Sequence, residues 1–142
     1  RESLRWRLLY RVLWRLTSGS SSLLKDETDE DVGRLRSMYK EIRRDAHKMK
    51  AFVRFRSIDA DANADGLSGR DGERFVAWHE PDHYIVPYVA PFFADRFADM
   101  DWTILTPDAS VRWDGESLEY GAGIERSKAP DADELDEMWK TY

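Results

Sequence analysis

The sequence predicts an α+β fold in which a mainly antiparallel sheet of about five strands packs with about four helices. Apolar residues recur every three or four positions over most of the first 50 residues and again around residues 91–100, which indicates helices. In several shorter stretches apolar and polar residues alternate, which indicates strands. A hydrophobic content of 42% over 142 residues is enough to build one core.

Two helices are expected at the start of the chain. The first covers residues 3–16, and its apolar positions are Leu4, Leu8, Val12 and Leu16. Arginines at residues 7, 11 and 15 form a second stripe, and Gly19 with the serines around it ends the helix. Thr28 or Asp29 can cap the second helix, whose apolar periodicity continues to about Lys50.

Two strands joined by a long hairpin loop should follow. Residues 51–58 alternate, with Val53 and Phe55 on one face, and residues 73–80 alternate in the same way. In the loop between them, residues 61–66 match the first half of an EF-hand calcium loop. Gly72 stands where that motif needs a bidentate Glu, and the flanks are strands, so no calcium site is expected.

The second half of the chain is expected to mix helices and strands. Helical spacing over residues 93–100 predicts a third helix, with Pro91 in its first turn. Residues 102–106 form an expected strand, and Asp114-Gly115 predicts a type I′ turn in the hairpin that follows. A final helix is expected over residues 131–142.

The composition limits where the protein acts. No apolar run approaches the roughly 20 residues of a membrane span, and the arginines in the first apolar stretch argue against a signal peptide. The chain has no cysteine, which excludes disulfides and cysteine-ligated zinc and favours the cytoplasm. Since the chain begins at Arg1 instead of Met and stops inside an expected helix, we expect one domain, residues 1–142, of a longer polypeptide.

Charge is divided unevenly along the chain. Residues 1–56 carry 15 basic and 8 acidic side chains, a net charge of +7, whereas residues 57–142 carry 7 basic and 20 acidic side chains, a net charge of −13. The first part could bind a polyanion that the second part would repel. Alternatively, the two parts pack together and complement each other.

Residues 79–83, His-Glu-Pro-Asp-His, match the zinc-protease pattern H-E-x-x-H, which needs both histidines on one helix face. Pro81 costs about 3 kcal/mol inside a helix, and the residues before it alternate as a strand, so no zinc site is expected. A different acid–base or metal cluster of Glu80, His83 and His47 stays open as the basis of a hydrolase or nuclease activity. The simpler alternative is that these are hydrogen-bonded structural groups.

Four longer strings carry a resemblance to one bacterial family: AHKMKAFVRFR, EPDHYIVPYVAPFFADRF, WTILTPDASVRWDG and LDEMWKTY. From about residue 29 onward the chain resembles the domain of unknown function 4130, whose members are described as DNA metabolism proteins. The resemblance implies that the domain is fused to, or encoded beside, uracil-DNA-glycosylase-like proteins and a radical S-adenosylmethionine (SAM) protein of DNA repair. The family-like positions are His47, Lys48, Phe52, Arg54, Phe55, Glu80, Pro81, His83, Phe92, Phe93, Arg96, Phe97 and Trp102.

Cations on the second expected helix and the strand after it supply a candidate DNA-binding surface. Its members are Arg36, Lys40, Arg43, Arg44, His47, Lys48, Phe52, Arg54 and Arg56. Lys and Arg can hold phosphates, and an exposed ring such as that of Phe52 can stack a base. Alternatively, the helix stripe is a solvated face, and Arg54 pairs with Glu80 on the neighbouring strand.

These features predict an accessory domain of bacterial DNA metabolism or repair that binds DNA or a repair-enzyme partner. We expect it to have no catalysis, metal or cofactor of its own. Two alternatives stay open: a hydrolase or nuclease, and a pure protein-interaction module that never touches DNA.

Overall fold

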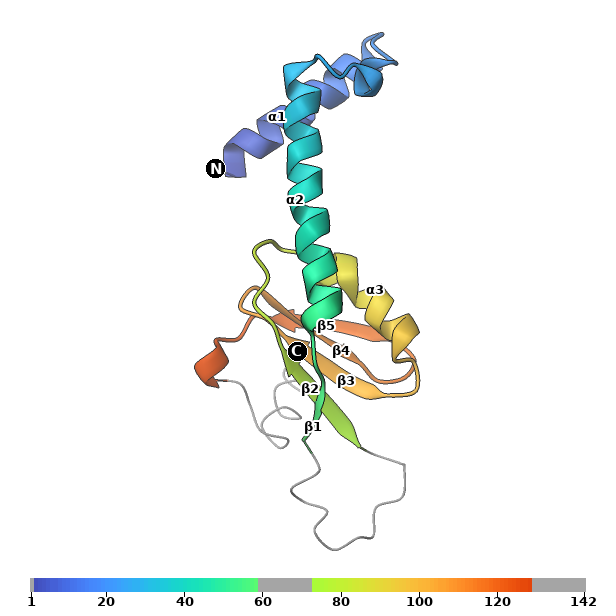
Figure 1. The fold of residues 1–142 in the computed structure, drawn as a ribbon, viewed down its shortest axis with the longest axis vertical. Helices are drawn as coiled ribbons and strands as arrows, with labels where there is room; N and C mark the ends of the chain where they lie inside the picture. The colour runs from blue at the N-terminus through green and yellow to red at the C-terminus, as the bar shows by residue number, and fades with distance from the viewer. Residues whose placement is uncertain (1, 59–72, 129–142) are drawn as a thin grey trace, which may run out of the picture. The chain divides into compact units, whose positions relative to one another are not determined.

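The structure, a computed structural model, describes residues 2–58 and 73–128 of the chain. In these ranges three α-helices and five strands follow in the order α1, α2, β1, β2, α3, β3, β4, β5 (Figure 1). The predicted α+β class is confirmed. The chain divides into two compact units, residues 1–44 and 45–142, and each has its own hydrophobic core. The hairpin loop that contains residues 61–66 and the expected helix over residues 131–142 lie outside the described residues.

The first unit consists of α1 (Glu2–Thr17), the 3-10 helix η1 (Leu23–Lys25) and the first part of α2 (Glu30–Phe52). Its core is made by the buried side chains of Leu8, Val12, Leu23 and Val32. Of the apolar positions that predicted α1, Leu8 and Val12 are therefore confirmed as buried, whereas Leu4 is 63% exposed.

A side-chain cap sets the start of α2. The Asp29 carboxylate accepts a hydrogen bond from the backbone N of Val32 at 3.1 Å, which satisfies one of the free donors of the first turn. Thr28, the other predicted cap, donates its hydroxyl to the Asp26 carboxylate in the preceding turn. Acidic residues in the first turn of α2 add negative charge at the positive end of the helix.

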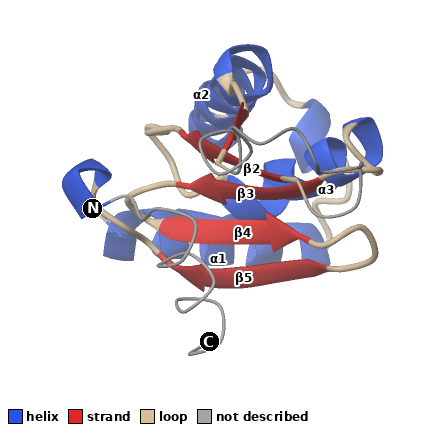
Figure 2. Cartoon of the chain, turned by 90° about the horizontal axis from the view of Figure 1, so that it is seen from below, coloured by secondary structure: helices blue, strands red, loops and turns tan. Residues whose placement is uncertain are grey.

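The second unit is built on a five-stranded sheet with the order β1-β2-β3-β4-β5 (Figure 2). Strands β1 (Arg56–Ser57) and β2 (Arg74–Trp78) pair antiparallel, as predicted for the hairpin. Strands β3 (Asp101–Leu105), β4 (Ala109–Trp113) and β5 (Leu118–Ala122) form an antiparallel meander. Among the described strands, only β2 and β3 pair parallel. A parallel pair needs a crossover, and α3 (Val86–Arg96) provides it.

Aromatic rings fill the core between α3 and the sheet. Phe93 of α3 and Trp102 of β3 are fully buried, with ring centroids 6.1 Å apart. The ring of Phe55 lies 6.0 Å from Phe93 and 5.6 Å from Trp102. The other face of the sheet carries a smaller cluster around Val76 and Leu105. Side chains that alternate along β2 thus pack into two different cores, one on each face of the sheet.

The segment after α2 is not the strand that its alternation predicted. α2 continues to Phe52, and within residues 51–58 only Arg56–Ser57 forms a strand. The Arg54 guanidinium donates hydrogen bonds to the carbonyl oxygens of Ala51 and Val53, at 2.6 and 3.0 Å. These bonds satisfy acceptors that the end of a helix otherwise leaves open, and they favour a longer helix.

The expectation that Pro91 opens the third helix is also wrong. α3 begins at Val86, and Pro87 occupies its first turn, where the missing N–H costs nothing. Pro91 lies inside the helix at an exposed position. The buried stripe through Val86, Val89 and Phe93 explains the early start, since its burial outweighs the hydrogen bond that is lost at Pro91.

The hairpin between β4 and β5 has a four-residue connection, Asp114–Ser117, in place of the predicted type I′ turn. That turn needs a positive φ at both central residues, but here Gly115 has one, at 100°, and Asp114 does not. The Asp114 carboxylate accepts hydrogen bonds from the backbone N of Glu116 and Ser117, both at 2.8 Å. These donors shape the turn and hold the pKa of Asp114 below its ordinary value.

Gly123 follows β5 and lies against the turn between β3 and β4. A Cβ at this position would come 1.9 Å from the carbonyl oxygen of Pro107 and 2.8 Å from the carbonyl carbon of Asp108, and backbone atoms cannot rotate away. We predict that Gly123→Ala lowers the free energy of unfolding by about 1–3 kcal/mol, the usual cost of overpacking. Urea unfolding followed by circular dichroism measures this. Ala122→Ser, at the exposed neighbouring position, should leave the midpoint unchanged, and an equal midpoint for both variants would contradict the close approach.

Candidate nucleic-acid interface

Four predicted DNA-binding residues form an exposed stripe in the first unit. Arg36, Lys40 and Arg43 follow at steps of four and three residues, so they share one side of α2, and Arg44 lies beside them. All four side chains are exposed, and we call them the basic stripe. Arg36 also donates to the carbonyl oxygen of Leu24 at 2.7 Å, which fastens the chain before α2 to the helix.

In the second unit the remaining predicted residues are His47, Lys48, Phe52, Arg54 and Arg56, and all five are exposed. The Phe52 side chain is 67% exposed, so its ring is open to a stacking partner. Arg54 has a structural role, because it caps the carbonyl end of α2.

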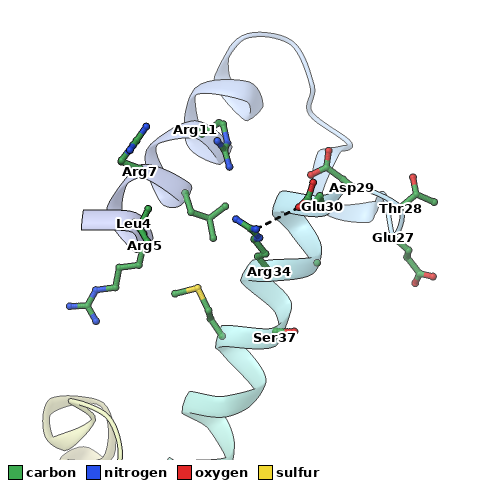
Figure 3. A pocket seen from close by; sticks show the side chains of 13 residues that line it. Leu4, Arg5, Arg7, Arg11, Glu27, Thr28, Asp29, Glu30, Arg34 and Ser37 are labelled. Carbon is green, nitrogen blue, oxygen red and sulfur yellow. Dashed lines mark ion pairs between the residues drawn. The ribbon is translucent and has the colours of Figure 1, made fainter. Parts of the chain in front are cut away.

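A cavity of about 990 Å³ opens between α1 and α2 in the first unit (Figure 3). Its lining combines apolar and charged side chains, among them Leu4, Leu8, Met38, Arg7, Arg34 and Glu30. Arg34 is turned toward Glu30, at 3.6 Å, one helical turn away. Because both signs of charge line this cavity, it is a poorer match for a polyanion than the basic stripe.

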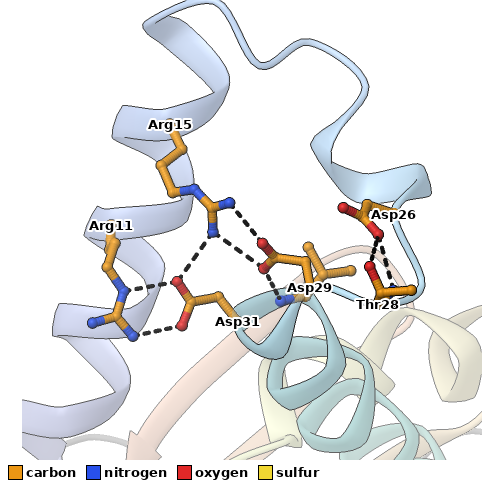
Figure 4. A network of polar contacts seen from close by, with 7 residues as sticks. Arg11, Arg15, Asp26, Thr28, Asp29 and Asp31 are labelled. Carbon is orange, nitrogen blue, oxygen red and sulfur yellow. Dashed lines mark hydrogen bonds and ion pairs between the residues drawn. The ribbon is translucent and has the colours of Figure 1, made fainter.

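Two arginines of α1 hold the first turn of α2 in a paired network (Figure 4). Arg11 donates two hydrogen bonds to Asp31, at 2.8 and 2.5 Å. Arg15 donates to both oxygens of Asp29, at 3.1 and 2.6 Å, and to Asp31 at 3.3 Å. We call these four residues the Arg–Asp clasp. Hydrogen bonds from Arg15 and Arg11 hold the pKa values of Asp29 and Asp31, respectively, below their ordinary range.

Residues 79–83 leave β2 as irregular chain, which confirms that they do not form the helix of a zinc protease. The backbone N of His79 donates to the Leu105 carbonyl oxygen at 3.0 Å, so it extends the pairing of β2 with β3. Burial lowers the pKa of the His79 imidazole, and the carboxylates of Asp45 and Asp82 oppose this shift. Pro81 is buried next to the exposed Glu80.

His83 is held by a buried carboxylate. Its backbone N donates to Asp45 Oδ2 at 2.7 Å, and its Nδ1 lies 3.1 Å from the same oxygen. Asp45 comes from α2 and is 4% exposed. The two contacts fasten the irregular segment to the end of α2 and orient the imidazole ring. An Asp at Nδ1 is also the arrangement that prepares Nε2 to act as a general base.

Of the predicted acid–base residues, the structure thus gives His83 a carboxylate partner, while Glu80 and His47 are exposed. Within residues 2–58 and 73–128, no group of three or more His, Asp or Glu side chains is arranged to hold a metal ion. The helices described include none that is long and apolar enough to cross a membrane.

The sequence did carry signals for two features that were missed. Asp45 falls between Ile42 and Ala46 in the apolar repeat of α2, and an acid on the buried side of a helix needs a partner. The second feature is a row of exposed aromatic residues on α1, which begins at Trp6 and repeats at four-residue spacing.

The Arg–Asp clasp predicts a pH dependence for the first unit. The pKa values of Asp29 and Asp31 lie below 3.8 in the folded state, so on acidification the unfolded state binds protons first. The stability that the clasp contributes is therefore full above about pH 5 and is lost as the pH falls through 3.8 and below. We expect Asp29→Asn/Asp31→Asn to flatten this loss, measured by thermal unfolding between about pH 5 and about pH 3. Glu30→Gln, exposed on the same turn, should keep the wild-type slope, and equal slopes in all three chains would contradict the prediction.

Comparison with known proteins places the chain in a family. A comparison with curated proteins finds no match, and a comparison with solved structures finds none either. A family model described as a domain of unknown function, DUF4130, matches residues 3–142, which is nearly the whole chain. The chain therefore belongs to the domain of unknown function 4130 family.

Proposed function

We propose that this chain is an accessory domain of bacterial DNA metabolism or repair that acts in the cytoplasm by contacting DNA. The observation that carries the proposal is the basic stripe on α2. Each of its four side chains is long, cationic and exposed, and a helix holds them on neighbouring turns. Such a row can neutralise several phosphates and releases counterions when it does so.

Arg43 and Arg44 are the members that best suit phosphate contacts. Both are exposed, and no hydrogen bond or ion pair with the described residues holds either guanidinium. Arg36, by contrast, already donates to the Leu24 carbonyl oxygen and lies 3.9 Å from Glu27. The sequence-independent nature of phosphate contacts fits an accessory role, in which another protein supplies the chemistry.

A repair enzyme is the partner that fits this role. The resemblance of the chain points to a uracil-DNA-glycosylase-like protein or a radical SAM protein. In this arrangement the domain holds DNA while the partner acts on it. If the domain only tethers the partner, DNA binding by the isolated chain will be absent.

The double variant Arg43→Glu/Arg44→Glu tests the proposal. We expect the wild-type chain to bind single-stranded, duplex and uracil-containing DNA at low salt, and to bind more weakly as salt rises. The variant should lose at least about tenfold in affinity, and its salt slope should fall by about 2, one for each lost phosphate contact. Filter binding of radiolabelled oligonucleotides at low and moderate salt measures both quantities.

The single variants Arg43→Glu and Lys25→Glu provide a matched comparison in the same unit. Both reverse one exposed charge, but only the first lies on the basic stripe. If the two variants lost the same amount of DNA affinity, the effect would come from the overall charge and not from a defined surface. Absence of binding by the wild-type chain at low salt would refute DNA contact and leave the partner-tethering role.

A second candidate function, a hydrolase or nuclease, rests on the contact between Asp45 and His83. A carboxylate at Nδ1 prepares the imidazole to accept a proton at Nε2, and Glu80 stands three residues before His83 in the same irregular segment. Structural histidines show the same kind of contact, so the accessory role is the first proposal.

Cleavage assays separate the two candidates. From the accessory role we expect no cleavage of single-stranded, duplex or uracil-containing DNA by the wild-type chain. Cleavage by the wild-type chain that is lost in Glu80→Gln and in His83→Ala, with unchanged circular dichroism, would favour the enzyme. His47→Ala, on α2, tests the third member of the predicted cluster in the same assay.

A further inference from the structure

One side of α1 exposes a row of large aromatic side chains. Trp6, Tyr10 and Trp14 follow at steps of four residues, and they are 62%, 72% and 60% exposed. The buried residues of the same helix, Leu8 and Val12, lie on the opposite side and belong to the core of the first unit. The row therefore contributes little to that core, and its exposure costs hydration free energy that a bound partner would recover.

The surroundings of this row are cationic. From Ser3 to Thr17, along α1, the sequence holds four basic residues and no acidic one. Arg7 and Arg11 line a shallow depression of about 530 Å³ together with the three aromatic side chains. The guanidinium of Arg5 lies 5.6 Å from the centroid of the Trp6 ring. Arg11 is engaged by Asp31 in the clasp, which leaves Arg7 as the main cation along the depression.

The spacing of the rings suits flat ligands. Residues four apart on a helix are separated by about 6 Å along its axis. A base inserted between two rings needs about twice the 3.4 Å rise of stacked nucleotides, or about 7 Å. Small rotations of the side chains make up this difference. Three successive aromatic positions can therefore stack successive unpaired bases, while a neighbouring arginine meets the phosphates.

We infer that the aromatic row of α1 (Trp6, Tyr10 and Trp14) is a stacking surface for the unpaired bases of single-stranded nucleic acid, with Arg7 at the phosphates. This inference rests on the proposed function and assigns single strands to the aromatic row, while duplex contact stays with the basic stripe. Bases in a duplex are stacked on each other and present no free face to the row. A second copy of the chain would bring the same arginines against each other, and their repulsion disfavours self-association through this face.

The test compares a single strand with a duplex. The full chain and the variant Trp6→Ala/Trp14→Ala are titrated with radiolabelled oligothymidine of about 15 nucleotides, within the length range of known single-strand sites, and with a duplex of equal length. We expect the variant to lose at least about tenfold in affinity for the single strand, since each stacked base is worth about fivefold or more. Its affinity for the duplex should change less than about twofold.

Two further variants separate stacking from general packing. Trp6→Phe/Trp14→Phe keeps an aromatic face at both positions and should retain most of the affinity for the single strand. Leu13→Ala removes an exposed apolar side chain, 60% exposed, from the same helix and should leave that affinity unchanged. Circular dichroism of each variant confirms that α1 is still formed.

The outcomes separate this inference from the proposed function. The stacking inference is refuted if Trp6→Ala/Trp14→Ala binds the single strand and the duplex as tightly as the wild type does. It is also refuted if the variant loses affinity for the two DNAs by the same factor. The basic stripe still supports DNA contact if Arg43→Glu/Arg44→Glu weakens both DNAs. If the wild-type chain binds neither DNA, both proposals fail. Trp6→Ala/Trp14→Ala could instead keep its affinity for the single strand and lose binding to anionic vesicles, which would assign the row to a membrane surface. If it kept that affinity and lost self-association, the row would be assigned to a second copy of the chain.

Discussion

The burial of Trp102 between α3 and the sheet is the packing constraint on which the second unit depends. Its ring lies on β3, and α3, which covers it, follows β2 in the sequence and returns the chain to the start of β3. This crossover makes β2 and β3 parallel in a sheet that is otherwise antiparallel in its described part. The segment between β2 and α3 also contains His83, which donates to the carboxylate of Asp45.

The first unit depends on charge as well as on apolar contact. Its buried core has few members, and the Arg–Asp clasp adds directed hydrogen bonds between α1 and the first turn of α2. The clasp also divides the arginines of α1 by role. Arg11 and Arg15 are neutralised by aspartates, whereas Arg7 stays beside the aromatic row. Arginines that form one stripe in the sequence thus divide between a structural role, for Arg11 and Arg15, and a role in contact, for Arg7.

Periodicity in the sequence predicted most of the fold, because the long helices and the central strands each bury one consistent face. It failed where tertiary packing outweighed a local signal. Pro91 is a strong start signal, but burial of Val86 and Val89 extends α3 past it. The pairing of His83 with Asp45 joins residues 38 positions apart, and no local pattern encodes that distance. The basic stripe was predictable because its four cations fall on one helix, whereas the role of Arg54 as a cap depends on where α2 ends.

Trp6 and Trp14 of the first unit and Trp102 of the second differ sharply in burial, and this affects how each of them fluoresces. Trp6 and Trp14 of α1 are more than half exposed, so water already surrounds their indole rings in the folded chain. Trp102 has no exposed surface, and its emission should move to longer wavelength only when the second unit opens. The emission of Trp102 should therefore report the loss of the α3–sheet core, whereas the emission of Trp6 and Trp14 should change little when α1 unfolds. Trp102 is thus an internal reporter for the packing of the second unit.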